Sequence, residues 1–309
     1  MQSEIRFFLI MNFINTIFAK LMQFLPKWFV RQFAKPYVAG LKTDEVLKVV
    51  ENLNDKGFSA TIDILGEFVN NQEEAISVKN QYAKLVKAIR EKDLDSTISV
   101  KLTHLGLDLD FNYCKDLMIE LTKEAKKCNV GITIDMENSP YTDSIYKIYK
   151  DTVKTFYKVG AVMQAYLYRS FDDLKDLNNS NLIIRICKGI YNEDSSIAIK
   201  DKKGINKNFK LLVQSVLSGD GYACIATHDI DLINEIEKWI CEKNIPKDRF
   251  EFQVLYGVPM IKTLNSLKSR GYKITVYVPF GSSWYDYSIR RLKENPKIIS
   301  YVIKNIFKK

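Results

Sequence analysis

Residues 272–296 read YKITVYVPFGSSWYDYSIRRLKENP, and this stretch shows how the chain is built. Its first part, residues 274–278, is β-branched and aromatic, which is typical of a buried strand. Pro279 then interrupts the strand, and Ser283 is a suitable N-cap for a helix that continues through Leu292. The stretch therefore predicts a strand followed directly by a helix.

Two adjacent arginines, Arg290 and Arg291, lie in the middle of this predicted helix. Neighbouring side chains on a helix point about 100° apart, so both can face one side only at a helix end or a cavity mouth. There, two guanidinium groups could bind a carboxylate through charge-assisted hydrogen bonds. Glu294 follows within one helical turn and can hold either arginine in place. For the pair taken alone, the simpler interpretation is a solvated charged helix face.

Strand and helix patterns of this kind alternate from Gly57 onward. The expected strands cover residues 60–65, 97–102, 130–135, 161–167, 182–186, 222–227, 250–254 and 274–278, and the expected helices cover 73–90, 111–127, 143–157, 171–177, 205–217, 232–242 and 260–269. Eight strand–helix units of roughly 30 residues each predict an α/β fold, a (β/α)8 TIM-type barrel. The β-branched strands suit a parallel sheet that is covered on both faces.

This pattern divides the chain into two parts. Residues 1–56 are expected to form an N-terminal helical extension, with a lead-in helix over residues 41–56. Residues 57–309 are expected to form the barrel, which would be the catalytic domain. A barrel of this size commonly folds as one unit, and the hydrophobic fraction of 46% is ample for its core.

Residues 1–40 differ from the repeats. Residues 7–11 and 13–25 are strongly apolar, but Asn15 and Lys20 interrupt the second run and no clear cleavage site follows it. The run is also too short and too interrupted to span a bilayer. We expect an amphipathic helical prefix that either packs on the domain or lies on a membrane surface.

The charge and the cysteines exclude several classes of function. The formal net charge of +9 comes from lysines that are scattered along the helices, and no nucleic-acid-binding motif accompanies them. We interpret this charge mostly as a source of solubility, with some attraction to a membrane surface. The five cysteines are widely spaced without a CxxC motif, which indicates reduced thiols in a cytosolic protein (Cys114, Cys128, Cys187, Cys224 and Cys241). With only His104 and His228, we expect no histidine-rich metal centre.

Polar side chains end nearly every predicted strand. The main examples are Lys101, Asp135, Gln164, Arg185, Lys188, Thr227, His228, Gln253 and Tyr277. Because the C-terminal ends of barrel strands meet at one face, where the active sites of TIM barrels lie, we expect these side chains to surround one site. Each of them taken singly could be a helix cap or a surface residue.

The order of these motifs resembles that of the proline dehydrogenase family. The similar segments are TIDILGE, ISVKLTHLG, ITIDME, QAYL, RICKGIY, IATHD, FEFQVLYGV, VYVPFG and WYDYSIRRLKENP, which lie between residue 57 and about residue 300. The resemblance implies a distorted (β/α)8 barrel that holds noncovalent FAD at the C-terminal ends of its strands. It also implies oxidation of L-proline to Δ1-pyrroline-5-carboxylate, the first step of proline catabolism, with the electrons passed to a membrane quinone.

The substrate pocket that this resemblance implies is cationic. Its residues would be Lys101, Tyr191, Leu255, Tyr277, Arg290 and Arg291, with Glu294 as a support. The two arginines would bind the carboxylate of L-proline and Lys101 would complete the pocket, because a buried carboxylate needs paired positive charge. Tyr277 would pack against the pyrrolidine ring and screen the reacting carbon from water.

The resemblance also implies a set of flavin contacts. These are Met136, Gln164, Arg185, Lys188, Gly189, Ile190, Thr227 and His228. Arg185 corresponds to an arginine near flavin N5, where a cation stabilises the negative charge that arrives with a hydride. Asp135 would orient Lys101. The catalytic residues that the resemblance implies are Asp135, Arg185 and Tyr277. Gly189 would let the backbone approach the cofactor, and Lys188 could meet a phosphate.

The implied reaction is hydride transfer from proline C5 to flavin N5, in which the protein supplies orientation and electrostatics. The implied partners are L-proline, a quinone acceptor and a downstream pyrroline-5-carboxylate dehydrogenase, without nucleic acid or a metal. We expect a cytoplasmic bacterial protein, with peripheral contact at the inner membrane as an option, in preference to a mitochondrial one.

Three positions depart from the family pattern. Thr275 lies where many relatives carry a basic residue, and Pro259 lies where a charged residue is common. Ile190 replaces a usual alanine beside the flavin loop. None of the three removes a group from the implied substrate pocket, so they bear on local loop conformation.

Two other functions stay open at the level of sequence. Lys101 could be the Schiff-base nucleophile of a barrel lyase with Asp135 as its acid or base. That function leaves Arg185, Gln164 and the arginine pair unexplained. The chain could also be a membrane-attached binding protein that has lost catalysis, although the presence of every expected pocket residue argues against this.

Overall fold

Eight parallel strands close into a barrel in the computed structural model, which describes residues 30–31, 34–177, 182–285 and 287–289. The strands follow one another in sequence order, and β8 pairs with β1 to close the sheet. They are β1 (Ser59–Ile64), β2 (Ser96–Val100), β3 (Ile132–Ile134), β4 (Val159–Gln164), β5 (Ile183–Cys187), β6 (Tyr222–Ala226), β7 (Phe250–Leu255) and β8 (Ile274–Phe280). The (β/α)8 TIM-type barrel that the alternating pattern predicts is confirmed.

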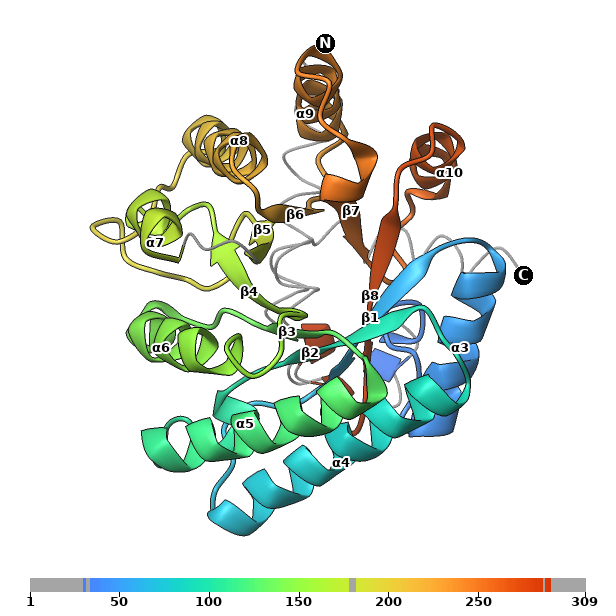
Figure 1. Cartoon of the computed structure of the whole chain (residues 1–309), viewed down its shortest axis with the longest axis vertical. Coiled ribbons are helices and arrows are strands. Elements are labelled where there is room, and N and C mark those ends of the chain that lie inside the picture. The colour runs from blue at the N-terminus through green and yellow to red at the C-terminus, as the bar shows by residue number, and fades with distance from the viewer. Residues whose placement is uncertain (1–29, 32–33, 178–181, 286, 290–309) are drawn as a thin grey trace.

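Helices surround the outer side of the barrel (Figure 1). They are α3 (Thr43–Asp55), α4 (Gln72–Glu91), α5 (Phe111–Cys128), α6 (Thr142–Thr152), α7 (Ser170–Leu177), α8 (Lys202–Ser218), α9 (Ile230–Glu242) and α10 (Ile261–Ser269). Short 3-10 turns occur at η2 (Thr103–Leu105), η3 (Ser139–Tyr141) and η4 (Lys247–Arg249). Helix α3 lies within the expected lead-in segment and packs against β1 and β8.

The helices have apolar stripes at helical spacing, and a polar side chain caps the start of several of them. In α4, the buried residues are Ala75, Val78, Tyr82, Leu85, Val86 and Ile89, which lie on one face. The Asn71 side chain accepts a hydrogen bond from the backbone N–H of Glu74 and so caps the first turn. Aspartates cap α5, α8 and α9 in the same way (Asp110, Asp201 and Asp229).

The strand side chains divide into an apolar outer set and a polar inner set. On β7, Phe250, Phe252 and Val254 belong to the buried apolar core that the helices share. Between them, Gln253 accepts a hydrogen bond from Arg185 on β5, a contact that passes across the barrel interior because it skips β6. TIM barrels are usually filled with branched apolar side chains. The interior of this barrel is polar instead, so the β-branched runs mark only its outer face.

Strand β8 continues through Pro279 to Phe280, although we expected Pro279 to interrupt it. Tyr277 pairs with Leu255 at the end of β7, so the later residues of β8 are in register with β1 alone. Pro279 lacks only a backbone donor, and a strand tolerates that loss where no neighbour needs the donor. Because β7 ends at Leu255, the β7 side of Pro279 has no ladder partner, and the proline can remain within β8.

The predicted N-terminal prefix lies mostly outside the described residues, because residues 1–29 and 32–33 are not among them. Its packing or membrane contact stays a prediction, as does the domain boundary after residue 56. Residues 290–309, with Arg290, Arg291 and Glu294, also lie outside the described part. In the part of the chain that is described, no helix is both long and apolar enough to cross a bilayer.

Candidate active site

A cavity of about 300 Å3 opens at the C-terminal ends of the strands. The sequence-predicted site residues that line it are Lys101, Asp135, Met136, Gln164, Arg185, Lys188, Gly189, Ile190, Tyr191, Thr227, His228, Leu255 and Tyr277. They come from strands β2 to β8 or from the residues that follow those strands. The structure therefore brings the described members of the predicted site together, and their individual roles stay predictions.

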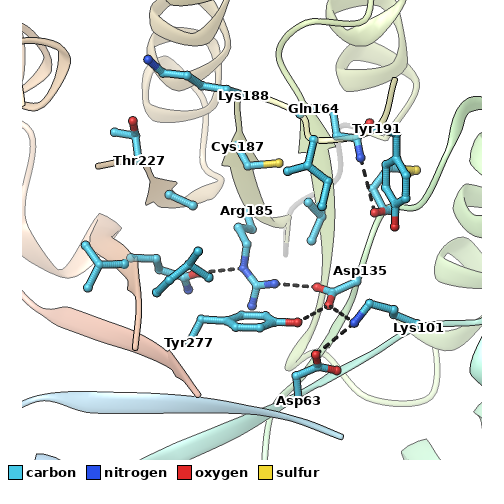
Figure 2. Close-up of a pocket in the computed structure, with 18 of the residues that line it drawn as sticks. Asp63, Lys101, Asp135, Gln164, Arg185, Cys187, Lys188, Tyr191, Thr227 and Tyr277 are labelled. Carbon is cyan, nitrogen blue, oxygen red and sulfur yellow. Dashed lines mark hydrogen bonds and ion pairs between the residues drawn. The ribbon is translucent and has the colours of Figure 1, made fainter. Parts of the chain in front are cut away.

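Lys101 lies between two carboxylates on the cavity wall (Figure 2). Its Nζ is 3.0 Å from Asp63 Oδ2 and 3.8 Å from Asp135 Oδ2. Burial alone would lower the pKa of Lys101, but the two carboxylates outweigh burial and raise that pKa above its ordinary value. Lys101 is thus a held ammonium ion, which suits the binding of an anion and disfavours its use as an amine nucleophile.

Asp135 joins side chains from three other strands. Its Oδ1 accepts hydrogen bonds from Ser99 Oγ on β2 at 2.7 Å and from Arg185 Nη1 on β5 at 2.6 Å. Its Oδ2 accepts a hydrogen bond from the Tyr277 hydroxyl on β8 at 2.9 Å. Burial raises the pKa of Tyr277 well above its ordinary value, and the nearby carboxylates raise it further. Tyr277 is therefore a neutral phenol that donates to Asp135.

Arg185 is a buried cation in the cavity wall, with 6% of its surface exposed. Burial would lower its pKa, but Asp135 more than compensates and the pKa is raised. Its Nε donates to Gln253 Oε1 at 2.6 Å, and its guanidinium carbon lies 5.2 Å from the centre of the Tyr277 ring. Its Nη2 is buried without a hydrogen-bond partner among the described residues. A positive charge is thus fixed in the wall of the cavity.

Gln164, at the end of β4, presents an open acceptor. Its Nε2 is 3.4 Å from the carbonyl oxygen of Met136 and 3.3 Å from that of Glu137. Its Oε1 is buried and has no hydrogen-bond partner among the described residues. Because a buried polar atom without a partner is costly, this oxygen is suited to a donor on a bound molecule.

The turn after β5 allows close approach to the backbone. Gly189 has a φ of +106°, and a Cβ at this position would lie 2.3 Å from the ring of Tyr166. Only glycine fits both that conformation and that space. Lys188, the preceding residue, donates to Asp229 Oδ2 at 2.7 Å. The edge of the cavity thus carries a glycine turn beside a fixed lysine.

His228 links two loops at the same edge. Its Nε2 accepts a hydrogen bond from the backbone N–H of Leu255 at 3.0 Å, which connects the ends of β6 and β7. Thr227 stabilises this segment because its Oγ1 accepts from the backbone N–H of Asp229 at 3.2 Å. Ile190, one of the three departures from the family pattern, is 48% exposed and also lines the cavity.

Several residues of the site were missed or left without a role by sequence reasoning. Asp63 is 1% exposed and is the nearest carboxylate to Lys101. Ser99, Gln253 and Glu251 complete the hydrogen bonds around Asp135 and Arg185. The signal that could have found them is the same for each, a polar residue at every second position of an otherwise apolar strand.

Comparisons with known proteins agree on one family. A family model described as proline dehydrogenase matches residues 46–303. The chain is 37% identical to Proline dehydrogenase 1 of Bacillus subtilis subsp. natto, over 94% of this chain and 95% of that protein. It is 31% identical to the proline dehydrogenase of Deinococcus radiodurans, over 89% of this chain and 90% of that protein.

A solved structure has the same fold. Proline utilization A (PutA) of Bdellovibrio bacteriovorus, inactivated by N-propargylglycine, superimposes with a TM-score of 0.79 at 23% identity. The match covers 85% of this chain and 33% of that one, so this chain spans about a third of the length of PutA. At this identity the likeness shows the barrel fold alone.

Proposed function

Because this chain belongs to the proline dehydrogenase family, we propose that it oxidises L-proline to Δ1-pyrroline-5-carboxylate with bound FAD and passes the electrons to a membrane quinone. The observation that carries the proposal is the cluster of Lys101, Asp135, Arg185 and Tyr277 on one cavity wall. A buried cation, Arg185, and a partly buried one, Lys101, are matched there by carboxylates, which suits an anionic substrate beside an electron-accepting ring.

The residues of the cavity fit a flavin dinucleotide. Gln164 has a buried oxygen without a partner among the described residues, which can accept from a polar ring edge, and Gly189 lines the cavity in a turn that packs on Tyr166. Lys188 would meet a phosphate at the edge of the cavity, with Met136, Ile190, Thr227 and His228 as further contacts. When bound, FAD supplies the acceptor for the hydride that leaves proline C5.

L-proline would be bound through its carboxylate. Lys101 is a cation held by Asp63 and Asp135, so it is already in place when the substrate arrives. Arg290 and Arg291, supported by Glu294, stay the proposed partners of the same carboxylate, although they lie outside the described residues. Tyr191, Leu255 and Tyr277 line the cavity and would exclude water from the reacting carbon.

Arg185 would stabilise the charge that develops in the reaction. Its guanidinium is buried in a setting where water cannot screen it, and Asp135 holds its Nη1. A fixed cation in such a setting costs no reorganisation when negative charge arrives nearby. Asp135 and Tyr277 would then act by keeping Arg185 and Lys101 in position.

The proposal is tested by the visible absorption spectrum of the purified protein. We expect the purified protein to show the visible absorption bands of oxidised flavin. Addition of L-proline in the absence of oxygen should bleach these bands. D-proline is the matched control and should bleach them far more slowly, because a D-proline whose carboxylate binds the same cations places its ring, and with it C5, differently. A soluble quinone should then restore the bands. A flavin that L-proline leaves oxidised would refute the proposal.

The two rival functions predict different results. A barrel lyase would form a covalent adduct on Lys101 when a carbonyl substrate is trapped with borohydride, whereas we expect none because Lys101 is held as an ammonium ion. A binding protein without catalysis would purify without flavin. Co-sedimentation with vesicles, for the whole chain and for a chain that begins at residue 30, tests the peripheral membrane contact.

A further inference from the structure

Glu251 is a buried carboxylate that lies away from the cavity lining. It is 5% exposed and lies on β7, two residues before Gln253, so both side chains point to the barrel interior. Its Oε1 accepts from Gln253 Nε2 at 2.5 Å, and its Oε2 accepts from the Tyr222 hydroxyl at 3.1 Å. Lys273 Nζ, on a half-exposed side chain, is 3.4 Å from the same Oε2. A buried carboxylate is costly unless it is paired and hydrogen-bonded, and these three neighbours supply the pairing.

Gln253 lies between a group that can only donate and a group that can only accept. Arg185 Nε–H is a donor without lone pairs, and an ionised Glu251 has lone pairs without a proton. The amide satisfies both neighbours in one orientation only, with Nε2 toward Glu251 and Oε1 toward Arg185. Glu251 and Arg185 therefore favour the same orientation of the Gln253 amide, and Glu251 holds that amide from the side opposite to Arg185.

This orientation fixes the guanidinium plane of Arg185. Asp135 and Ser99 hold its Nη1 at 2.6 Å and 3.0 Å, and Gln253 holds its Nε at 2.6 Å from the opposite side of the barrel. One hydrogen-bonded end alone would leave the group free to rotate about that end. Two ends define its plane against the ring of Tyr277.

We propose that Glu251 and Gln253 are positioning residues, which act on the reaction through the orientation of Arg185. The inference rests on the proposed function, because only that function places a flavin beside Arg185. Lys273 and Tyr222 lie at the N-terminal ends of β8 and β6, so the support for Arg185 extends from the opposite end of the barrel up to the cavity. A barrel interior filled with apolar side chains could not supply these hydrogen bonds to Arg185.

Three variants separate this role from a general effect on folding. Gln253→Met keeps the length of the side chain and removes the acceptor for Arg185 Nε. Glu251→Gln removes one of the two groups that fix the Gln253 amide, because a glutamine at position 251 can donate as well as accept, so Arg185 alone then orients it. Tyr222→Phe is the matched control, since it removes a hydrogen bond from the other oxygen of Glu251 and leaves the Gln253–Arg185 contact intact.

Two readouts are needed beside turnover. The first is hydrogen exchange of the Arg185 Nε–H in the flavin-free protein, followed by NMR. We expect slow exchange in the wild type and in Tyr222→Phe, and at least tenfold faster exchange in Gln253→Met. The second is the midpoint potential of the bound flavin, which should become more negative in Gln253→Met because a misaligned cation stabilises the reduced form less. We expect kcat to fall about tenfold in the same variant.

The double variant tests whether Glu251 acts through Gln253. In the wild-type background, Glu251→Gln should shift the potential and lower kcat by about threefold, and in the Gln253→Met background it should add almost nothing. Equal effects in both backgrounds would mean a direct charge effect and overturn the proposal, as would unchanged exchange at Arg185 in Gln253→Met. A wild type whose flavin is not reduced by L-proline would instead refute the proposed function, while the exchange experiment would still report on the Arg185 contact.

Discussion

Asp135 accepts hydrogen bonds from residues on three other strands, namely Ser99, Arg185 and Tyr277. Its Oδ2 also lies 3.8 Å from Nζ of the partly buried Lys101, so Asp135 balances Arg185 and shares Lys101 with Asp63. Such an arrangement is favourable only when the remaining lone pairs are satisfied, and here the serine and tyrosine hydroxyls satisfy them. The residue thus sets the positions of the groups proposed for the substrate and for the flavin.

Gly189 sets the shape of the turn beside the proposed flavin. We expect Gly189→Ala to lose at least nine-tenths of its bound FAD, because a Cβ there would lie 2.3 Å from the Tyr166 ring and the φ of +106° disfavours any other residue. The flavin-to-protein absorbance ratio of the purified protein measures this. Gly219→Ala is the matched control, since its nearest atom would be 3.8 Å away at an ordinary φ. Full flavin content in Gly189→Ala would contradict the assigned role.

Glu137 makes the stability of the protein depend on pH. Burial raises its pKa from an ordinary value of 4.5 to about 7, although hydrogen bonds from Thr103 oppose the rise. Between these two values the folded protein keeps a proton that the unfolded chain has released. The free energy of unfolding must therefore decrease as pH rises through this window, by about 3 kcal/mol in total.

We expect Glu137→Gln to remove this dependence, because an amide does not titrate and can still accept from the backbone N–H of Thr103. Urea unfolding of both proteins at pH 5 and pH 8 measures it. The variant should gain about 2–3 kcal/mol relative to the wild type on going to the higher pH. A difference between the two proteins that stays constant with pH would show that Glu137 does not titrate in this range.

At the scale of the elements, sequence periodicity located the strands and helices well because local spacing decides them. The predicted helix over residues 111–127 and α5 (Phe111–Cys128) differ by one residue, for example. The helix expected over residues 143–157 instead ends at Thr152, and the strand expected over residues 161–167 is β4 (Val159–Gln164). Pro279 is a further exception, because its place within β8 depends on where β7 ends, and that is a property of the sheet. The spacing of apolar residues alone could not reveal that the polar face of each strand points to the barrel interior.

Helix α9 connects fold and site through its capping residue. Asp229 accepts from the backbone N–H of Leu232, and its other oxygen accepts from Lys188 at 2.7 Å. Burial would raise the pKa of Asp229, but hydrogen bonds from Lys188, Lys202 and Asn206 outweigh it and lower that pKa. One aspartate thus starts the helix and fixes a lysine at the cavity edge.

Two substitutions at Asp229 separate these tasks. Asp229→Asn keeps an oxygen for the cap and removes the charge that holds Lys188, so we expect weaker FAD binding with little loss of stability. Asp229→Ala removes both and should lose about 1 kcal/mol more of stability. Thermal unfolding of the flavin-free proteins and titration with FAD measure the two effects. Equal flavin affinity in Asp229→Asn and wild type would show that the Lys188 contact is not used.

At the scale of the whole molecule, the barrel gathers residues that are far apart in sequence. The resemblance to a family pointed to Lys101, Gln164 and Arg185, and the closed sheet brings them to one cavity. The resemblance could not point to the pairing of Lys101 with Asp63 or of Arg185 with Gln253. The two residues of these pairs lie 38 and 68 positions apart in the sequence. Such pairs follow from how the barrel closes.

Gln164 Oε1 and Arg185 Nη2 are buried without a hydrogen-bond partner among the described residues. We therefore expect the flavin-free protein to be less stable than the protein with FAD bound. A ligand that binds only the folded state adds about 2.7 kcal/mol at a concentration of 100 Kd. For a chain of this size, each kcal/mol corresponds to about 2–4 °C in Tm, so saturating FAD should raise Tm by roughly 5–10 °C. Differential scanning fluorimetry of the stripped protein measures the shift.

The controls for this prediction are the two glycine variants described above. Gly189→Ala should show little or no rise in Tm with FAD, because its turn would no longer accept the cofactor. Gly219→Ala should show the full rise, since that glycine faces ordinary contacts away from the cavity. If FAD raised the Tm of the Gly189 variant as much as that of the wild type, the cofactor would bind elsewhere. If no protein responded, the cavity would not be a flavin site, because mass action requires a specific ligand to stabilise the fold that binds it.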